Sequence, residues 1–420
     1  MSLLRVHPDN AWRMDLYLPF VIIYFFFNSL FLPLGLLYTT TLAPVFYYWL
    51  WRQKERWIVA RLMIIFVPFI FFHLRNGVDK KFYAISLALT VAVYIVAYAF
   101  YVFVNWSQRL EDIFQSLVFT NFFMSLIGVV LFFTPWEEAM WRRPEMVSEG
   151  IRLTRFQMFT YEPSYYCTLL APLVLWTFFK FAQKTEPRNL ALFLMTVIPL
   201  MMSYSLGVIS AMLIAIAGVH LWHVRRVIRR NYMLVGAPVS AAIAGFVLLS
   251  SNTFAARIQN FLSGKDSSGS VRTVLSYALA YYIALQKSLW WGVGFGQIKV
   301  LGADLTEQFF GGGNGRLPCV IAETMAQFGF IGLAIRLGLQ VYLFRKTKVT
   351  ENYYRLALFI FMFVYQFTGS YFTSIAEYVI WILAFSPVFP EFSVEKSQEK
   401  WYAWFIPRMR LAQPAPEPSH

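Results

Sequence analysis

The sequence predicts an all-α polytopic membrane protein with about twelve transmembrane helices and two long loops on its outer face. Three observations predict this fold class. Of the 420 residues, 58% are hydrophobic and only 14% are charged, whereas a soluble domain carries about 25% charged residues. Apolar runs of about 17–25 residues, each long enough to cross about 30 Å of hydrocarbon, recur along the whole chain. These runs lack the period-2 alternation of outer-membrane β-barrel strands.

The apolar runs set the order of the elements. We expect spans at about residues 17–33, 34–51, 57–74, 82–104, 113–134, 164–182, 189–205, 207–223, 232–250, 319–344, 353–369 and 373–389. The split between 189–205 and 207–223 depends on Pro199 and on the small residues from Ser203 to Gly207. The chain then divides into N-terminal membrane helices (1–134), a first outer loop (135–163), central membrane helices (164–250), a large outer loop (251–318), C-terminal membrane helices (319–390) and a cytoplasmic tail (391–420).

Basic residues predict the orientation, because short loops rich in Lys and Arg stay in the cytoplasm. With both termini in the cytoplasm, the short loops on that side carry Arg52, Lys54, Arg56, Arg109, Lys180, Lys184, Arg188, Arg225, Arg226, Arg229, Arg230, Arg345, Lys346 and Lys348. The opposite orientation would place all of these cations outside. The net charge of +14 therefore reflects topology, and we expect the lipid bilayer, not nucleic acid, as the partner.

The two outer loops, about 135–161 and 251–318, are the only long ones, and loops of this length are usually functional or disordered. Both carry cations, which long loops tolerate: Arg142, Arg143, Arg152 and Arg155, then Arg257, Lys265, Arg272, Lys287, Lys299 and Arg316. Two interpretations stay open. The cations form an ordinary solvated surface, or they bind an anionic lipid head group or a diphosphate.

The large loop contains a predicted interfacial helix from Val271 to Trp291. An apolar stripe at 3–4 spacing is expected to face the bundle, and it consists of Val274, Leu275, Ala278, Leu279, Tyr282 and Ile283. Trp290 and Trp291 end this helix, and Trp favours the membrane interface. The following Gly292-Val293-Gly294-Phe295-Gly296 string predicts a tight turn. It is no dinucleotide site, since no strand precedes it.

Glu162 is the first candidate catalytic residue. It precedes Pro163 and Ser164 where the sixth span begins, and Pro suits the first helical turn. One interpretation is a carboxylate that caps the positive end of the helix. The other is a base that accepts a proton from a sugar hydroxyl, with Arg152 and Arg155 nearby to bind phosphate oxygens.

Arginines of the large loop and acids inside the spans are further candidates. Arg257, Arg272 and Arg316 could stabilise a leaving lipid diphosphate, and interfacial anchoring is the alternative for them. Glu323 and Glu377 lie about one turn inside their helices, and intramembrane acids are functional candidates by default. Another set of arginines, nearer the cytoplasmic ends, is expected to snorkel and anchor the helices: Arg61, Arg336 and Arg355.

Several signatures are missing from the sequence. It contains no paired D-x-D aspartates, no His in either long loop and no nucleotide-binding loop. We therefore expect no metal and no cofactor, and an energised substrate that is already outside. Cys167 and Cys319 each begin an apolar helix, which predicts two packing residues and no disulfide.

Taken together and in order, these motifs resemble the Wzy-type polymerase and O-antigen ligase superfamily of envelope polysaccharide enzymes. The resemblance covers about Arg152 to Glu377, and each motif alone is loose. The elements are Arg152 and Arg155 before Glu162-Pro163-Ser164, the opening Ser203-Tyr204-Ser205-Leu206-Gly207, the loop with Arg272, the turn Trp291–Gly296, and Asn314 followed by Glu323 and Gln327-Phe328-Gly329-Phe330-Ile331-Gly332.

The resemblance implies a GT-C-like helical fold in the bacterial inner membrane and an active site that faces the periplasm. It implies inverting, metal-independent transfer of a glycan from undecaprenyl diphosphate, with a chain-length regulator as a further candidate partner. Catalytic roles are implied for Arg272 and for Arg155 or Arg152. Arg257, Arg316, Asn314, Glu323 and Glu377 are the remaining candidates for binding the lipid-linked oligosaccharide.

Two departures from the family pattern bear on the type of enzyme. Ligases have a His beside the loop Asn, and here Gly313 precedes Asn314, which favours a polymerase over a ligase. Leu206 stands where the family often has Arg. The alternatives to a polymerase are a ligase that transfers the glycan to lipid A-core, a flippase for the lipid-linked oligosaccharide, and a structural scaffold. The scaffold would leave the cationic outer loops without a role.

Overall fold

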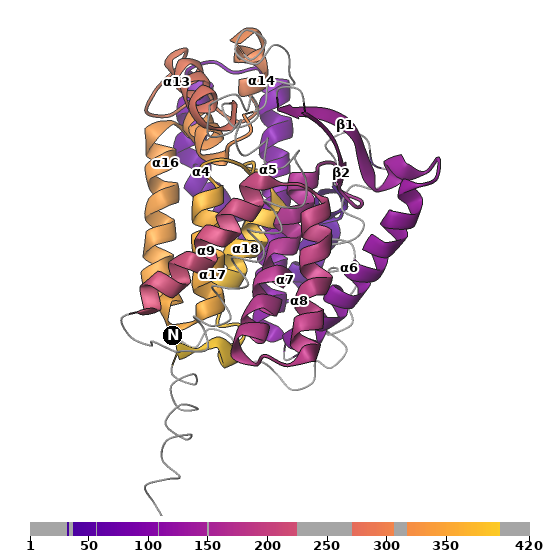
Figure 1. Ribbon diagram of the computed structural model, residues 1–420. Helices are drawn as coiled ribbons and strands as arrows, with labels where there is room; N and C mark the ends of the chain where they lie inside the picture. Colours follow the sequence, from indigo (N-terminus) through magenta and orange to yellow (C-terminus); the bar gives the residue numbers. More distant parts are fainter. Residues whose placement is uncertain are drawn as a thin grey trace, which may run out of the picture.

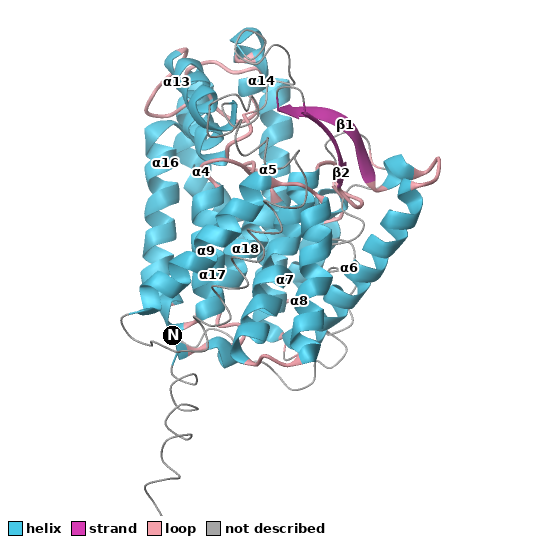
Figure 2. Ribbon diagram, in the orientation of Figure 1, coloured by secondary structure: helices cyan, strands magenta, loops and turns pink. Residues whose placement is uncertain are grey.

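A computed structural model gives the arrangement of the chain and describes residues 32, 37–55, 57–107, 109–148, 151–224, 271–305 and 317–394. Figure 1 and Figure 2 show a bundle of helices, crossed obliquely by α9, with α13 and α14 at one end and a two-stranded β-hairpin beside them. We call this the hairpin end. The predicted helical class is therefore confirmed for the described residues, apart from the hairpin.

The described helices begin and end close to the predicted spans. They are α2 (Tyr38–Thr41), α3 (Ala43–Arg52), α4 (Ile58–Arg75), α5 (Lys80–Trp106), α6 (Leu110–Phe132), α7 (Pro163–Gln183), α8 (Pro187–Met202), α9 (Leu206–Val224), α13 (Ser276–Leu285), α14 (Ile298–Leu301), α16 (Val320–Lys346), α17 (Tyr353–Tyr365) and α18 (Ile375–Phe385). Short helical turns lie at Glu137–Ala139 (η2), Val271–Leu275 (η3), Val349–Glu351 (η4) and Pro390–Phe392 (η5). The strands are β1 (Trp141–Ser148) and β2 (Ile151–Phe156).

Within the described residues, five helices are long and apolar enough to cross a membrane: α4, α5, α6, α7 and α16. The split between α8 and α9 falls at Ser203–Ser205 as predicted. The expected spans at 17–33 and 232–250 lie outside the described residues. The chain is thus a helical protein with membrane-spanning character.

The C-terminal pair of helices is shorter than the sequence suggested. The predicted spans 353–369 and 373–389 extend beyond the observed helices by up to four residues, because α17 stops at Tyr365 and α18 runs from Ile375 to Phe385. A helix of thirteen residues rises only about 20 Å, less than the about 30 Å of a bilayer core. The segment that connects them, Gln366–Ser374, therefore lies inside the bundle, below α13 and α14 in Figure 1.

Helix α7 is the centre of the fold. Nearly all of its side chains are buried, and it packs against α6, α8, α9, α17 and α18. A helix that is apolar all round is expected in such a position or as a membrane span. The residue that precedes α7, Glu162, is consequently held inside the protein.

The first outer loop contains the hairpin, which the sequence analysis did not predict. Strands β1 and β2 pair antiparallel, with Trp141 opposite Phe156 and Arg142 opposite Arg155. The Trp141 indole N–H donates to the Gly128 carbonyl of α6 over 2.7 Å, and the buried Phe156 ring packs edge-on against Tyr166 of α7. These apolar contacts fix the base of the hairpin over the start of α7.

The predicted glycine turn is confirmed, and it pairs with a break in α16. Gly329 has a non-helical backbone (φ 66°, ψ −167°) in the middle of α16. The peptide groups freed by the break bond to the turn: Gly294 N–H donates to the Gln327 carbonyl (3.0 Å), and Phe330 N–H donates to the Leu289 carbonyl (2.9 Å). A Cβ on Gly292 would lie 2.3 Å from the Gln327 carbonyl carbon. Only glycine permits this approach of two backbones.

Helix α13 is shorter than the predicted helix of the large loop, and its buried face coincides with the predicted stripe only at Leu279 and Ile283. It ends at Leu285, and the predicted stripe residues Val274 and Tyr282 are exposed. The buried positions are Ser276, Leu279, Ala280, Ile283 and Ala284. Small residues at this face allow close packing against α16, because backbones approach where side chains are short.

Two of the three expected anchoring arginines are buried instead, which corrects that expectation. Arg355 donates to the backbone carbonyls of Ala384 (3.0 Å) and Thr347 (2.7 Å). Arg336 forms an ion pair with Glu377. Arg61 is exposed and pairs with Glu55 over 3.5 Å. Cys167 and Cys319 are buried free thiols, as predicted.

Candidate functional site

Glu162 lies at the N-cap position of α7, with Pro163 as the first helical residue. Its side chain makes no capping hydrogen bond to the helix, so the simple capping interpretation does not describe its carboxylate. The carboxylate instead accepts the Ser164 hydroxyl over 2.5 Å and the Arg272 guanidinium over 3.1 Å. Glu162 is therefore an ionised group with two fixed donors.

Arg272 reaches Glu162 from the large outer loop, through the π-helical turn η3 that precedes α13. π-Helical turns are rare in proteins, and those that occur are often found at functional sites. Both side chains of the pair are largely buried, at 27% exposure for Arg272 and 16% for Glu162. The structure thus brings together two of the three predicted catalytic residues.

The electrostatics of the pair favour its charged form. Burial raises the pKa of Glu162, but the opposing charge of Arg272 and the hydrogen bond from Ser164 outweigh burial, so the pKa lies below its usual value. Burial likewise lowers the pKa of Arg272, and Glu162 more than offsets it, so the pKa of the guanidinium is raised. The carboxylate stays ionised at neutral pH.

A cavity of about 670 Å³ lies against Glu162, a size typical of ligand sites. Its polar and charged lining residues include Arg142, Glu162, Lys299, Glu323 and Gln327. Its apolar lining residues include Leu37, Leu89, Val93, Ile298 and Leu317. Tyr161, Tyr165 and Tyr371 also line it. Such a cavity suits an amphiphile with an anionic or sugar head.

Glu323 is the second carboxylate of this cavity, and it is fixed at both oxygens. Gln327 donates its amide to one oxygen over 2.9 Å, and the backbone N–H of Phe372 donates to the other over 2.7 Å. As predicted, Glu323 lies in the first turn of its helix. A carboxylate held in this way is a fixed acceptor for a hydroxyl group.

Arg155, the third predicted catalytic residue, lies beside the site and is not among the residues that line the cavity. It is buried, and its Nε donates to the Ser203 carbonyl over 3.0 Å. Its charge also helps to lower the pKa of Glu162. The structure therefore places Arg155 where it joins β2 to the α8–α9 junction and stabilises the carboxylate.

Of the other predicted residues, two lie within the described part of the chain and three lie outside it. Glu377 is buried, pairs with Arg336 and is not among the residues that line the cavity. Arg152 lies in β2 with Met146 as its strand partner. Arg257, Asn314 and Arg316 lie outside the described residues.

The sequence placed Arg142 and Lys299 only among the cations of the outer loops, and it did not indicate the tyrosines of the cavity. Arg142 donates to the Tyr161 carbonyl over 3.4 Å and stands opposite Arg155 in the hairpin. The alternation of apolar and polar residues over Ile151–Thr154 is typical of a strand, and it could have indicated the hairpin that places Arg142. Among the described residues, no group of three or more His, Cys, Asp or Glu side chains is arranged to hold a metal ion.

Comparison with known proteins finds no family model that matches the chain and no similar curated protein.

Proposed function

We propose that the protein is a polysaccharide polymerase of a bacterial inner membrane. It transfers a growing glycan from undecaprenyl diphosphate to a lipid-linked repeat unit at the periplasmic face, without a metal and with inversion. The observation that carries this proposal is the Glu162–Arg272 pair. Glu162 lines a large cavity with both polar and apolar lining residues, and Glu162 and Arg272 share a smaller pocket. A base, a phosphate-binding cation and a surface for a lipid chain are what this reaction needs.

In the proposed reaction, a hydroxyl of the acceptor repeat attacks the anomeric carbon of the donor glycan. The new carbon–oxygen bond forms as the bond to the diphosphate oxygen breaks, and Glu162 accepts the hydroxyl proton. The leaving diphosphate takes the bonding electron pair. Arg272 stabilises the negative charge that develops on it, which is the contribution expected of a preorganised cation.

Arg272 is able to contact Glu162 and the diphosphate of the donor at the same time. A guanidinium carries five N–H donors in a planar fork, so one donor orients Glu162 while others bind phosphate oxygens. The phosphate oxygens would draw the guanidinium away from Glu162. The pKa of the carboxylate would then rise, because the positive charge of Arg272 is shared between the carboxylate and the phosphate. The carboxylate becomes a better base when the donor is bound.

The proposal is tested with purified full-length protein and a chemically defined undecaprenyl-diphosphate-linked repeat unit, with EDTA present. Polymerase activity gives a ladder of products separated by one repeat. No ladder with the wild type, or a ladder that EDTA abolishes, would contradict the metal-independent polymerase.

A flippase for the same lipid-linked glycan is the second candidate, and the break of α16 at Gly329 favours it, since transporters use interrupted helices. The two are separated by where a loss-of-function variant accumulates substrate. With Arg272→Ala, single repeats on the periplasmic leaflet indicate a polymerase, and single repeats on the cytoplasmic leaflet indicate a flippase.

A further inference from the structure

The segment Gln366–Ser374, between α17 and α18, forms part of the wall of the site. Tyr371, Thr373 and Ser374 line the large cavity. Ser370, Tyr371 and Ser374 also line a smaller pocket beside it that Glu162 and Arg272 share. Where this segment lies therefore decides the shape of both spaces.

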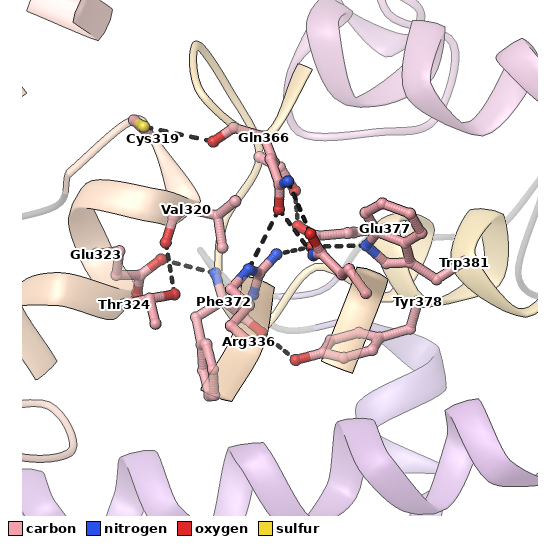
Figure 3. A network of polar contacts seen from close by, with 12 residues as sticks. Cys319, Val320, Glu323, Thr324, Arg336, Gln366, Phe372, Glu377, Tyr378 and Trp381 are labelled. Carbon is pink, nitrogen blue, oxygen red and sulfur yellow. Dashed lines mark hydrogen bonds and ion pairs between the residues drawn. The ribbon is translucent and has the colours of Figure 1, made fainter. Parts of the chain in front are cut away.

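A buried ion pair lies directly behind the segment. Arg336 of α16 and Glu377 of α18 are in contact, with side-chain exposures of 12% and 1%. One carboxylate oxygen also accepts the Trp381 indole N–H over 3.2 Å. The other oxygen accepts the Ser370 hydroxyl over 2.6 Å. Figure 3 shows Arg336 and Trp381 converging on Glu377.

The network continues from the ion pair to both ends of the segment. Arg336 Nε donates to the Gln366 side chain over 3.3 Å, at the start of the segment. The Phe372 N–H donates to Glu323, and the Phe372 carbonyl accepts the Tyr378 hydroxyl over 2.9 Å. Figure 3 shows two groups of contacts, one around Arg336 and Glu377 and one that joins Glu323, Phe372 and Tyr378. The backbone connects the two groups, because Ser370 lies two residues before Phe372 and Tyr378 follows Glu377.

Stability alone is a poor reason for the pair. The desolvation of two buried charges can exceed their attraction, and hydrophobic residues of similar volume often replace such a pair without loss. Ionisable groups inside apolar helices therefore point to function. Ser370 also has a left-handed backbone (φ 67°), a strained conformation that persists only where its surroundings hold it.

We infer that Glu377, with Arg336 as its counter-ion, is a positioning residue, which fixes the segment Gln366–Ser374 through the Ser370 hydroxyl and so sets the places of Tyr371 and Glu323 in the site. This inference deepens the proposed polymerase function and depends on it for its activity readout. Neither residue touches the substrate in this assignment, so Glu377 is not a substrate-binding residue.

Two double variants without charge test the inference. Arg336→Met with Glu377→Gln keeps an acceptor for Ser370, whereas Arg336→Met with Glu377→Leu removes it. We expect both to unfold near the wild-type temperature. The Gln variant should retain most of kcat. The Leu variant should lose about 100-fold in kcat, with a smaller change in KM, because misplacement of site groups by about 1 Å has an effect of this size. Ser370→Ala should resemble the Leu variant.

Hydrogen exchange of the full-length protein gives a readout that does not need the proposed function. The Phe372 amide is expected to exchange faster in the Leu variant and in Ser370→Ala than in the Gln variant or the wild type. Equal exchange and equal kcat in the two double variants would overturn the inference. If the wild type makes no polymer but exchange still differs, the proposed function fails and the positioning role stands.

Discussion

The Arg272 guanidinium lies 3.1 Å from the Glu162 carboxylate, although 110 residues separate the two in the sequence. Glu162 precedes the central helix α7, and Arg272 precedes α13, which packs on α16 at the hairpin end. The pair therefore couples the outer loop to the core of the bundle. Its carboxylate also lines the large cavity.

The first prediction is that Arg272 and Glu162 carry the activity. Arg272→Ala and Glu162→Gln should each lower kcat by about 10²–10³-fold, the effect of removing one group that stabilises developing charge. Arg272→Lys should recover only part of the rate, because Lys lacks the planar fork. The measurement is the initial rate of ladder formation with purified protein.

Arg143→Ala is the matched control for charge. Arg143 belongs to the first outer loop, as Glu162 does, but it is exposed and pairs with Glu138, and exposed pairs contribute little. Its loss should leave the rate within about twofold of the wild type. A comparable loss of rate in Arg143→Ala and Arg272→Ala would mean that general loop charge, and not the pair, supports activity.

The second prediction concerns pH. The pKa of Glu162 is depressed by Arg272, so the stability contributed by the pair is present above the pKa of the unfolded chain. That stability is lost as pH falls through the lower pKa of the folded protein. The same carboxylate must be ionised to accept a proton, and the rate should therefore fall only at acid pH.

Arg272→Met removes the largest opposing charge, so the pKa of Glu162 rises and the acid limb of the pH–rate profile moves to higher pH. The shift is partial, because Arg155 and Arg142 also lower this pKa. Glu162→Gln should remove the limb from the residual rate. An acid limb that stays in place in both variants would assign the titration to another group.

Sequence reasoning reached the parts of this fold that are encoded locally. Apolar runs gave α4 to α9 and α16 within a few residues, because length and hydropathy decide a membrane helix. Glu162 was found because Pro163 identifies the first turn of α7. The glycine turn was found because glycines permit a positive φ.

Contacts between residues far apart in the sequence could not be predicted from local patterns. Nothing local indicates that Glu162 meets Arg272, that Arg336 turns inward to Glu377, or that Lys299 lines the cavity. These contacts depend on how helices far apart in sequence pack together. The roles of Arg257, Asn314 and Arg316 stay predictions, since these residues lie outside the described part of the chain.

The third prediction tests the contact between the glycine turn and the broken helix. Gly292→Ala combines a positive φ of 75° with a Cβ placed 2.3 Å from the Gln327 carbonyl carbon. Strain of this kind costs of order 1–3 kcal/mol before any shift of the backbone. Thermal unfolding in detergent should show a clear fall in the midpoint.

Gly338→Ala is the control for that experiment. Gly338 lies in α16 with open space around the added Cβ, so Ala should stabilise the helix by roughly 0.5–1 kcal/mol. Opposite signs for two Gly→Ala changes would show that the turn, and not the loss of glycine, is responsible. A neutral Gly292→Ala would mean that the two backbones do not approach as described.

The fourth prediction tests the orientation. Arg143 is exposed at the hairpin end. Lys184, at the α7–α8 turn, and Lys348, beside η4, are exposed at the other end of the bundle, where α7 and α16 end. With the predicted topology, Arg143→Cys should react with a membrane-impermeant maleimide in intact spheroplasts. Lys184→Cys and Lys348→Cys should react only after permeabilisation. The native Cys167 and Cys319 are buried, so the parent chain should give little background. If the maleimide labels all three Cys variants in intact spheroplasts, the two ends of the bundle lie in one compartment. That result would contradict a bundle that crosses the membrane.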